Sequence, residues 1–462
     1  MRSNSTSSPK KSAENRGLAL QILLFSLPLM ASNVLQVLFN MADIAVVGRF
    51  AGSLSMAAVG STSTAVTLFT GLLIGFSSSI NALVAKYFGA RDKEGMGKTV
   101  HTGAIISLTL GVLLLLYGLF GSHALLSLLN TKEELIGKAT VYMQIYFLGM
   151  PALAVFNFGN AVLSAIGDTK KPLYFLSASG VLNVLLNLLF VIVFRLDVVG
   201  VALASIISQY LSASLVLAAL FRAKGDFGMR LCRLRIDLKS SKQILMLGIP
   251  SGVQYAIFYV ANLFIQAGVN SFDTTMVAGN SAAANADGLV YDVMAAFYTA
   301  CTSFIGRAYG AGESRRITRI YFICLAYSFG AGLVLGLSLV AAGPAFLSLF
   351  TADAAVVEAG MKRLLIMGLS YAVSAFMDNA IAALRGIGKS IVPMIMVILG
   401  SCVFRIIWVY TVFAFFGTIA SLYLLYVFSW SITAALESWY LYRSYKREVL
   451  TVSRTGVEPS WF

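Results

Sequence analysis

The sequence predicts an all-α integral membrane protein with twelve transmembrane helices, arranged as two parallel six-helix repeats. Three observations lead to this fold class. The chain has 462 residues, of which 58% are hydrophobic and only 12% are charged, so it carries more apolar surface than a soluble protein of this size could bury. Apolar windows of about 20 residues, the length that crosses a bilayer, recur along the chain. Several short motifs occur twice, at a nearly constant shift.

Twelve apolar windows follow one another, and each is long enough to form a membrane-spanning helix. The first follows a polar and basic segment, which is also how a secretory signal begins. It is too long for the apolar part of a signal peptide and no small-residue cleavage site follows, so we expect it to remain as the first span. The predicted spans are 18–41, 55–80, 99–121, 135–160, 172–194, 198–221, 244–270, 276–305, 320–342, 357–383, 391–415 and 417–441.

The distribution of positive charge predicts the orientation. With twelve spans and a cytoplasmic amino terminus, the two tails and the cytoplasmic loops hold 27 of the 34 Lys and Arg residues. Six remain on the outside, Arg363 among them, and Arg405 alone lies within a span. Because Lys and Arg concentrate in cytoplasmic loops, we expect both termini in the cytoplasm and the protein in the cell inner membrane. Basic loops beside anionic lipid explain the net charge of +14 without nucleic acid.

Several chemistries lack their motifs. The four cysteines are scattered without C-x-x-C spacing, so neither a disulfide framework nor a zinc site is indicated. No Walker A loop, G-x-S-x-G or H-E-x-x-H sequence is present. We therefore expect no cofactor and no enzyme activity, and any uphill transport has to use an ion gradient.

The repeat divides the chain into halves. FSLPLM and LGIPSG align Pro28 with Pro250, a shift of 222 residues, while AKYFGARDKE and GRAYGAGESR align at a shift of 221. LSAIGDTKKP and LRGIGKSIVP align at 221 as well. Repeats of this kind are typical of secondary transporters, with the substrate site between the halves. The predicted domains are an N-tail 1–17, an N-lobe 18–221, a basic linker 222–243, a C-lobe 244–445 and a C-tail 446–462.

One face of the first span is polar. Asn33, Gln36, Asn40 and Asp43 fall within about 80° of arc on a helical wheel. A carboxylate at bilayer depth costs about 2.5–3.5 kcal/mol on insertion scales, so this face should meet a wet cavity or a protein partner. Pro28 removes one helical hydrogen bond and is the predicted hinge.

The seventh span has a similar stripe, but the carboxylate is not repeated. Asn40 aligns with Asn262, whereas Asp43 aligns with Ile265. Acids of the second half lie elsewhere, and we expect the two lobes to be specialised. The stripe consists of Tyr255, Tyr259, Asn262, Gln266 and Asn270, and the acids are Asp287, Asp292, Asp378 and Glu437.

Four further polar residues have alternative interpretations. Asn183 and Asn187, one turn apart, either coordinate an ion or bond across to the first span. Arg405 is predicted to pair with a buried acid such as Asp378 rather than to bind an anionic substrate. Glu437, close to the end of its span, is predicted to be interfacial.

These motifs together resemble the multidrug and toxic compound extrusion (MATE) family, from about residue 18 to residue 445. The resemblance rests on Pro28, Asp43 and Gly48 in the first span, and on the loops YFGARD and AYGAGE. It also rests on SAIGDTKKP, on GIP at Pro250, and on D-N-x5-R-G-I-G from Asp378. Each motif is weak alone, but their order in both halves is specific.

The resemblance implies two six-helix bundles in a V that export amphipathic compounds, often cationic, in exchange for H⁺ or Na⁺. Asp43 and Asp378 match acids that members use for ion coupling, so Na⁺ could bind at either. Asn183 fits the fifth-span pattern of the proton-linked branch, whereas Asn187 stands where that branch has an acid. Gln254 lies near or at a position where some members have glutamate. The expected cavity residues are Gln36, Asn40, Gln254, Tyr255, Tyr259, Asn262, Asp287 and Arg405.

The expected function is therefore cation-coupled antiport of small amphipathic organic cations by alternating access. We expect a monomer whose other partner is membrane lipid. A flippase for a lipid-linked saccharide or another amphiphile would share the fold and is the alternative.

Overall fold

The computed structural model describes residues 9–129, 131–225, 227–230, 232 and 234–449, and regular structure in that part of the chain is entirely helical. The first half contains α1 (Pro9–Val46), η1 (Val47–Ala51), α2 (Ser53–Gly89), α3 (Lys93–Leu128), α4 (Glu133–Phe147), α5 (Met150–Ile166), α6 (Lys170–Leu188), η2 (Leu189–Val193) and α7 (Asp197–Arg222). The second half contains α8 (Leu238–Val269), α9 (Thr274–Gly310), α10 (Ser314–Ala341), α11 (Gly343–Leu347), α12 (Ala354–Gly386), α13 (Ile391–Val397), η4 (Ile398–Val403), α14 (Phe404–Trp408), η5 (Val409–Phe413), α15 (Ala414–Phe416), α16 (Ile419–Ser444) and η6 (Tyr445–Val449). The η elements are short π-helical turns, most of which continue a longer helix.

Side-chain caps fix where several of these helices begin. Asp92, Asp237, Asp273 and Asp353 each precede a helix and accept a hydrogen bond from a backbone N–H of its first turn, at 2.8–2.9 Å. Thr418 does the same for α16. These side chains satisfy backbone donors that the helix leaves without an intrahelical partner.

The number of spans agrees with the prediction. Within the described residues, eleven helical segments are long and apolar enough to cross a membrane, and α4 with α5 makes a twelfth when counted as one span. That pair is bent by 47°, so the predicted span 135–160 consists of two helices rather than one. Pro151 lies at the start of α5 and cannot donate the backbone bond that would continue α4. The fold class is confirmed.

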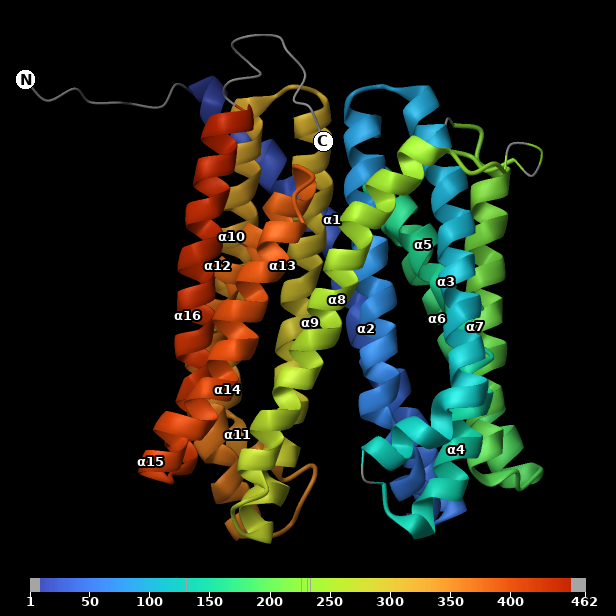
Figure 1. The fold of residues 1–462 in the computed structure, drawn as a ribbon, viewed down its shortest axis with the longest axis vertical. Helices are drawn as coiled ribbons and strands as arrows, with labels where there is room; N and C mark the ends of the chain where they lie inside the picture. Colours follow the sequence, from blue (N-terminus) through green and yellow to red (C-terminus); the bar gives the residue numbers. More distant parts are fainter. Residues whose placement is uncertain (1–8, 130, 226, 231, 233, 450–462) are drawn as a thin grey trace, which may run out of the picture.

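The helices form two bundles side by side (Figure 1). We call the bundle of α2–α7 the N-lobe and the bundle of α9–α16 the C-lobe. Both described ends of the chain lie at the same end of the molecule as the α2–α3 and α9–α10 loops (Figure 1), and we call it the basic end because the linker and these loops carry much of the positive charge. The opposite end, with α4 and α11, is the far end.

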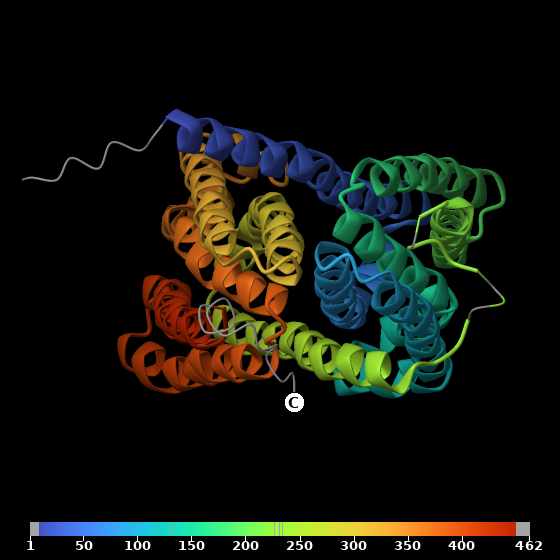
Figure 2. The same cartoon turned by 90° about the horizontal axis from the view of Figure 1, so that it is seen from above.

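Helix α1 crosses from one lobe to the other. Its first half packs in the C-lobe core, where Leu18, Ile22, Phe25 and Leu29 lie buried among residues of α9, α10 and α12. Its second half packs on α6 in the N-lobe, where a Cβ at Gly180 would collide with the ring of Phe39. Figure 2 shows α1 lying along both bundles.

Helix α8 crosses in the opposite sense. Ile244 and Leu247 lie in the N-lobe core, together with residues of α2, α3 and α5. Further along, the backbone carbonyl of Ile257 accepts a bond from Cys402 in the C-lobe. Pro28 and Pro250 lie inside these two helices. The lobe limits 18–221 and 244–445 remain a prediction, and each crossing helix contacts both lobes.

Candidate functional site

Asp43 lies near the end of α1 and is held by neutral donors only. The amide Nδ2 of Asn187 on α6 donates to its Oδ1 at 2.5 Å, and the hydroxyl of Ser205 on α7 donates to its Oδ2 at 3.4 Å. No Lys or Arg in the described part of the chain forms an ion pair with it. The carboxyl group of Asp43 therefore has no positive charge to balance it inside the N-lobe.

Asn183 and Asn187 extend this site into α6. Asn187 is fully buried, and its amide also contacts the Oδ1 of Asn183 at 3.2 Å. Of the two roles left open by the sequence, the structure shows the bond across to α1. The Oδ1 of Asn187 has no hydrogen-bond partner among the described residues, so one acceptor of the site is still unused.

Sequence reasoning missed Ser205. It lies in a run of small polar residues on one face of α7, in which Ser208 and Ser212 are also buried. A stripe at this helical spacing was visible in the sequence and signals a helix face that packs against polar partners.

The rest of the polar stripe of α1 lies toward the C-lobe or remains exposed. Asn33 donates from Nδ2 to the backbone carbonyl of Asp292 on α9 at 2.8 Å. Gln36 and Asn40 are exposed. Tyr255 and Tyr259 of α8 pack against Gly71 of α2, and thus lie between the two bundles.

A second polar site lies in the C-lobe around Arg385, near the end of α12. Its Nη2 donates to Oε1 of Gln254 on α8 at 3.0 Å, and the guanidinium lies 5.7 Å from the centre of the Tyr255 ring. Asp378 lies two turns before Arg385 on the same face of α12. Two residues expected near the coupling ion and the substrate, Asp378 and Gln254, thus share a basic neighbour.

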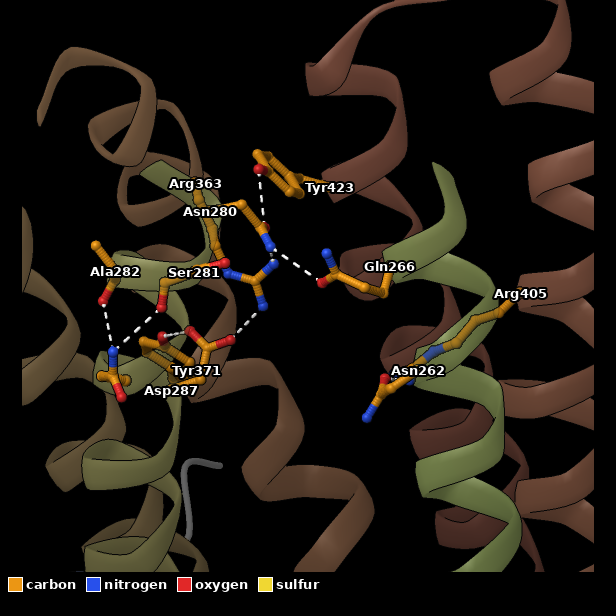
Figure 3. A network of polar contacts seen from close by, with 11 residues as sticks. Asn262, Gln266, Asn280, Ser281, Ala282, Asp287, Arg363, Tyr371, Arg405 and Tyr423 are labelled. Carbon is orange, nitrogen blue, oxygen red and sulfur yellow. Dashed lines mark hydrogen bonds and ion pairs between the residues drawn. The ribbon is translucent and has the colours of Figure 1, made fainter. Parts of the chain in front are cut away.

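A third polar site connects α9 to α12 and α16 toward the far end (Figure 3). Arg363 on α12 donates to Oδ2 of Asp287, and its other nitrogen donates to Oδ1 of Asn280 at 2.7 Å. Tyr371 donates to the remaining oxygen of Asp287, and Tyr423 donates to Asn280 at 3.0 Å. The assignment of Arg363 to the outside was wrong. It lies more than two turns into α12 and is buried, because Asp287 balances its charge.

Arg405 does not pair with Asp378, contrary to the prediction. Its Nε donates to Ser429 at 3.2 Å and its Nη1 donates to Asn262 at 3.0 Å, while Nη2 has no partner in the described chain. The guanidinium lies 4.6 Å from the Phe258 ring and 4.7 Å from the Tyr426 ring. Two aromatic faces and two neutral oxygens thus take the place of a carboxylate.

Glu437 is not interfacial either. Its side chain is 0% exposed, and neither carboxyl oxygen has a hydrogen-bond partner in the described part of the protein. The prediction failed because α16 continues beyond it and packs on α12 over this stretch. It is the most completely buried acid among the described residues.

The two lobes are in direct contact at the basic end. A Cβ at Gly310 of α9 would lie 1.9 Å from the backbone oxygen of Lys86, and a Cβ at Gly89 of α2 would lie 2.0 Å from the backbone oxygen of Arg307. Gly89 and Gly310 are equivalent in the repeat, so the contact is nearly symmetric. The guanidinium of Arg307 also donates to the carbonyl of Ala165 in the N-lobe at 2.8 Å. The space between the lobes is therefore closed at this end.

Twin bundles, crossing first helices and polar sites inside the apolar helices define the class of repeat-built membrane transporters. The chain belongs to the MatE family, whose model matches residues 28–189 and 250–411. The two matches begin 222 residues apart, the shift that aligns Pro28 with Pro250.

Individual relatives cover most of the chain. A Bacillus subtilis protein described as "Probable multidrug resistance protein YpnP" is 32% identical over 297 residues, which are 64% of this chain and 66% of that protein. A Thermotoga maritima protein described as "Probable multidrug resistance protein NorM" is 23% identical over 390 residues, 81% of each chain. A solved structure of a multidrug resistance MATE family transporter in an outward-facing conformation matches with a TM-score of 0.86 at 23% identity, over 95% of this chain and 97% of that one. The likeness to that structure shows the shared fold.

Proposed function

We propose that the protein is a multidrug exporter, a transporter rather than an enzyme, that exchanges amphipathic organic cations for H⁺ or Na⁺ by alternating access. It acts in the cell inner membrane with the basic end in the cytoplasm. The relatives described as multidrug resistance proteins support export as the activity. The surplus of Lys and Arg at the basic end supports the orientation.

The observation that carries the proposal is the environment of Asp43. A carboxyl group held by Asn187 and Ser205, without a basic partner in the described chain, can accept either a proton or a cation. A permanent ion pair would prevent that exchange, because the internal charge would already be balanced. Substrate and coupling ion then compete for the same group, and each favours the conformation in which it binds better.

The change between the two access states makes and breaks the contact between the lobes at the basic end. With Gly89 and Gly310 in contact with the opposite lobe, the path to the cytoplasm is closed, and the exposed polar face of Gln36 and Asn40 serves the path to the far end. Rocking of the lobes separates the glycines and opens the other path. Asp378 provides the coupling carboxylate of the C-lobe, beside Arg385.

The test is transport of a fluorescent organic cation in proteoliposomes, with Na⁺ and pH gradients imposed separately. Asp43→Asn keeps the size and the hydrogen-bonding capacity of the side chain but removes its charge. We expect it to insert normally and to lose gradient-driven efflux. Glu94→Gln, at an exposed acid on α3, is the matched control and should transport like the wild type. Full efflux by Asp43→Asn would refute the assignment.

Arg405 favours a second candidate, a flippase for an amphiphile with an anionic head group. It is a buried guanidinium without a carboxylate partner in the described chain, and one of its nitrogens is unused. A flippase needs positive charge for a phosphate or diphosphate group. A lipid-flipping assay with a fluorescent anionic lipid separates the two functions, because the exporter should not accelerate transfer of that lipid between leaflets.

A further inference from the structure

A group of charged side chains in the C-lobe is not explained by cation exchange at Asp43. It consists of Asp378 and Arg385 on α12 and of Glu437 on α16, a helix that packs on α12. Glu437 is fully buried, and both of its oxygens are without a hydrogen-bond partner among the described residues. An ionised carboxylate in that setting would be strongly unfavourable, because nothing replaces its hydration.

Arg385 does not neutralise Glu437 through a direct ion pair in the described chain. Its Nη2 donates to Gln254, its guanidinium faces the ring of Tyr255, and its Nε is buried without a partner. The arginine is therefore held by uncharged groups on α8, while one donor remains available. Glu437 is left without any donor.

Charge balance gives the number of cations that the group requires. Two ionised carboxyl groups and one guanidinium sum to one negative charge, and a buried net charge is costly. One monovalent cation makes the group neutral. We propose that Glu437 holds this cation as an exchangeable proton, so that Asp378, Arg385 and Glu437 form a proton site in the C-lobe, separate from Asp43.

In the part of the chain that the structure describes, no ion pair joins Glu437 to a basic side chain on the elements packed on α16. Arg405 on α14 and Cys402 on η4 lie toward Ser429, two turns away along α16. The sequence of α13 has no titratable side chain, and α8 contributes the uncharged Gln254 and Tyr255. On α16 itself, Arg443 lies further toward the exposed end of the helix.

A cavity lies near the basic end, lined by residues of α2, α8, α13 and α16 and of the loop before α13. It has a volume of about 280 Å³, and Gln243, Lys389, Ser390 and Tyr440 contribute its polar lining. Tyr440 lies three residues after Glu437 and hence on the same face of α16, less than one turn away. The cavity therefore approaches Glu437 from the basic end, and Glu437 itself is not part of its lining.

This proton site deepens the proposed exchange and rests on it for its role in transport. If Asp43 and Glu437 each exchange one proton, Glu437→Gln should halve the number of protons moved per substrate. The presence of the proton itself does not depend on transport, so it can be tested separately.

The test is infrared spectroscopy of the purified protein in lipid nanodiscs at neutral pH, following the carbonyl band of protonated carboxylic acids. We expect Glu437→Gln to remove one component of this band in difference spectra. Asp43→Asn should leave that component in place, and Glu358→Gln, at an exposed acid on α12, should change nothing. Glu437→Asp keeps the acid and should shift the component, which serves as a second test if the Gln variant does not fold.

Two results would overturn the proposal. One is a protonated-carboxyl band that Glu437→Gln and Glu437→Asp both leave unchanged. The other is loss of the Glu437 component on addition of Na⁺ at constant pH, which would make this a Na⁺ site instead. Failure of the exporter proposal would appear differently, as absence of gradient-driven efflux by the wild-type protein with the infrared component intact.

Discussion

The ion pair between Arg363 and Asp287 allows a quantitative prediction about stability. In Arg363→Met the guanidinium is replaced by an uncharged chain of similar reach, and Asp287 is left inside the C-lobe without its counter-charge. Removing one partner of a buried ion pair costs about 3–5 kcal/mol. The side chain of Asp287 is 24% exposed and keeps the bond from Tyr371, so the cost should lie near the lower end, about 3 kcal/mol.

The measurement is thermal unfolding of the purified protein in detergent. For a unit of 150–250 residues, about the size of one lobe, each kcal/mol shifts Tm by roughly 2–4 °C, so Arg363→Met should melt roughly 6–12 °C below the wild type. Lys362→Met is the matched control, because Lys362 is the adjacent residue and is exposed; it should melt like the wild type. The double variant Asp287→Asn/Arg363→Met removes both charges and should recover much of the loss.

Two outcomes would contradict this reasoning. If Arg363→Met melts together with Lys362→Met, the ion pair adds no stability. If the double variant is no more stable than Arg363→Met, the loss comes from packing against Tyr423 and Tyr426 rather than from the unpaired carboxylate.

The other two predictions concern the basic end. Gly310→Ala places a methyl group against the carbonyl of Lys86, so spin labels in the α2–α3 and α9–α10 loops should report a larger separation than in the wild type. Gly330→Ala is the control, because its methyl group meets no atom within 4 Å, and it should leave the separation unchanged. Equal separations in both variants would exclude a role of this contact in closure. The backbone N–H of Ser240 lowers the pKa of Asp237, which caps α8, so the capping contribution is present at neutral pH and is lost as pH falls below the usual value of 3.8. Asp237→Ala should lower the free energy of unfolding at pH 7 by about 1 kcal/mol. It should also make the free energy of unfolding less dependent on pH in this acidic range, as measured by denaturant unfolding at several pH values. If the pH dependence of the variant equals that of the wild type, the cap does not titrate as described.

The sequence was sufficient for the fold class, because apolar windows and a repeat of motifs are properties of the chain alone. It was also sufficient to single out Asp43, since a carboxylate in an apolar window is costly wherever the helix lies. It could not show that α1 and α8 cross between the lobes. Both helices carry apolar residues on most of their surface, and such a surface does not specify which bundle covers it.

The partners of the charged residues were harder to predict. Arg405 is satisfied by amide and hydroxyl oxygens and by two rings, and such neutral partners are too common in the sequence to identify. Arg363 was counted as outside although it falls within the predicted span 357–383, and Glu437 was predicted to be interfacial because it lies near the end of the predicted span 417–441. Helix α16 continues to Ser444. The partners of Arg363 on α9 lie 76 and 83 residues away in the sequence, so its burial was not apparent from its position along the chain.

The exchange of first helices between the lobes has a consequence for biosynthesis. Until Ile244 and Leu247 have been synthesised and inserted, the N-lobe lacks part of its core. The first half of α1, with Ile22 and Phe25, cannot pack until the C-lobe has been synthesised. Neither half of the repeat is then a self-sufficient folding unit. Severing the connection between the halves would yield two fragments that become stable only when they meet in the bilayer.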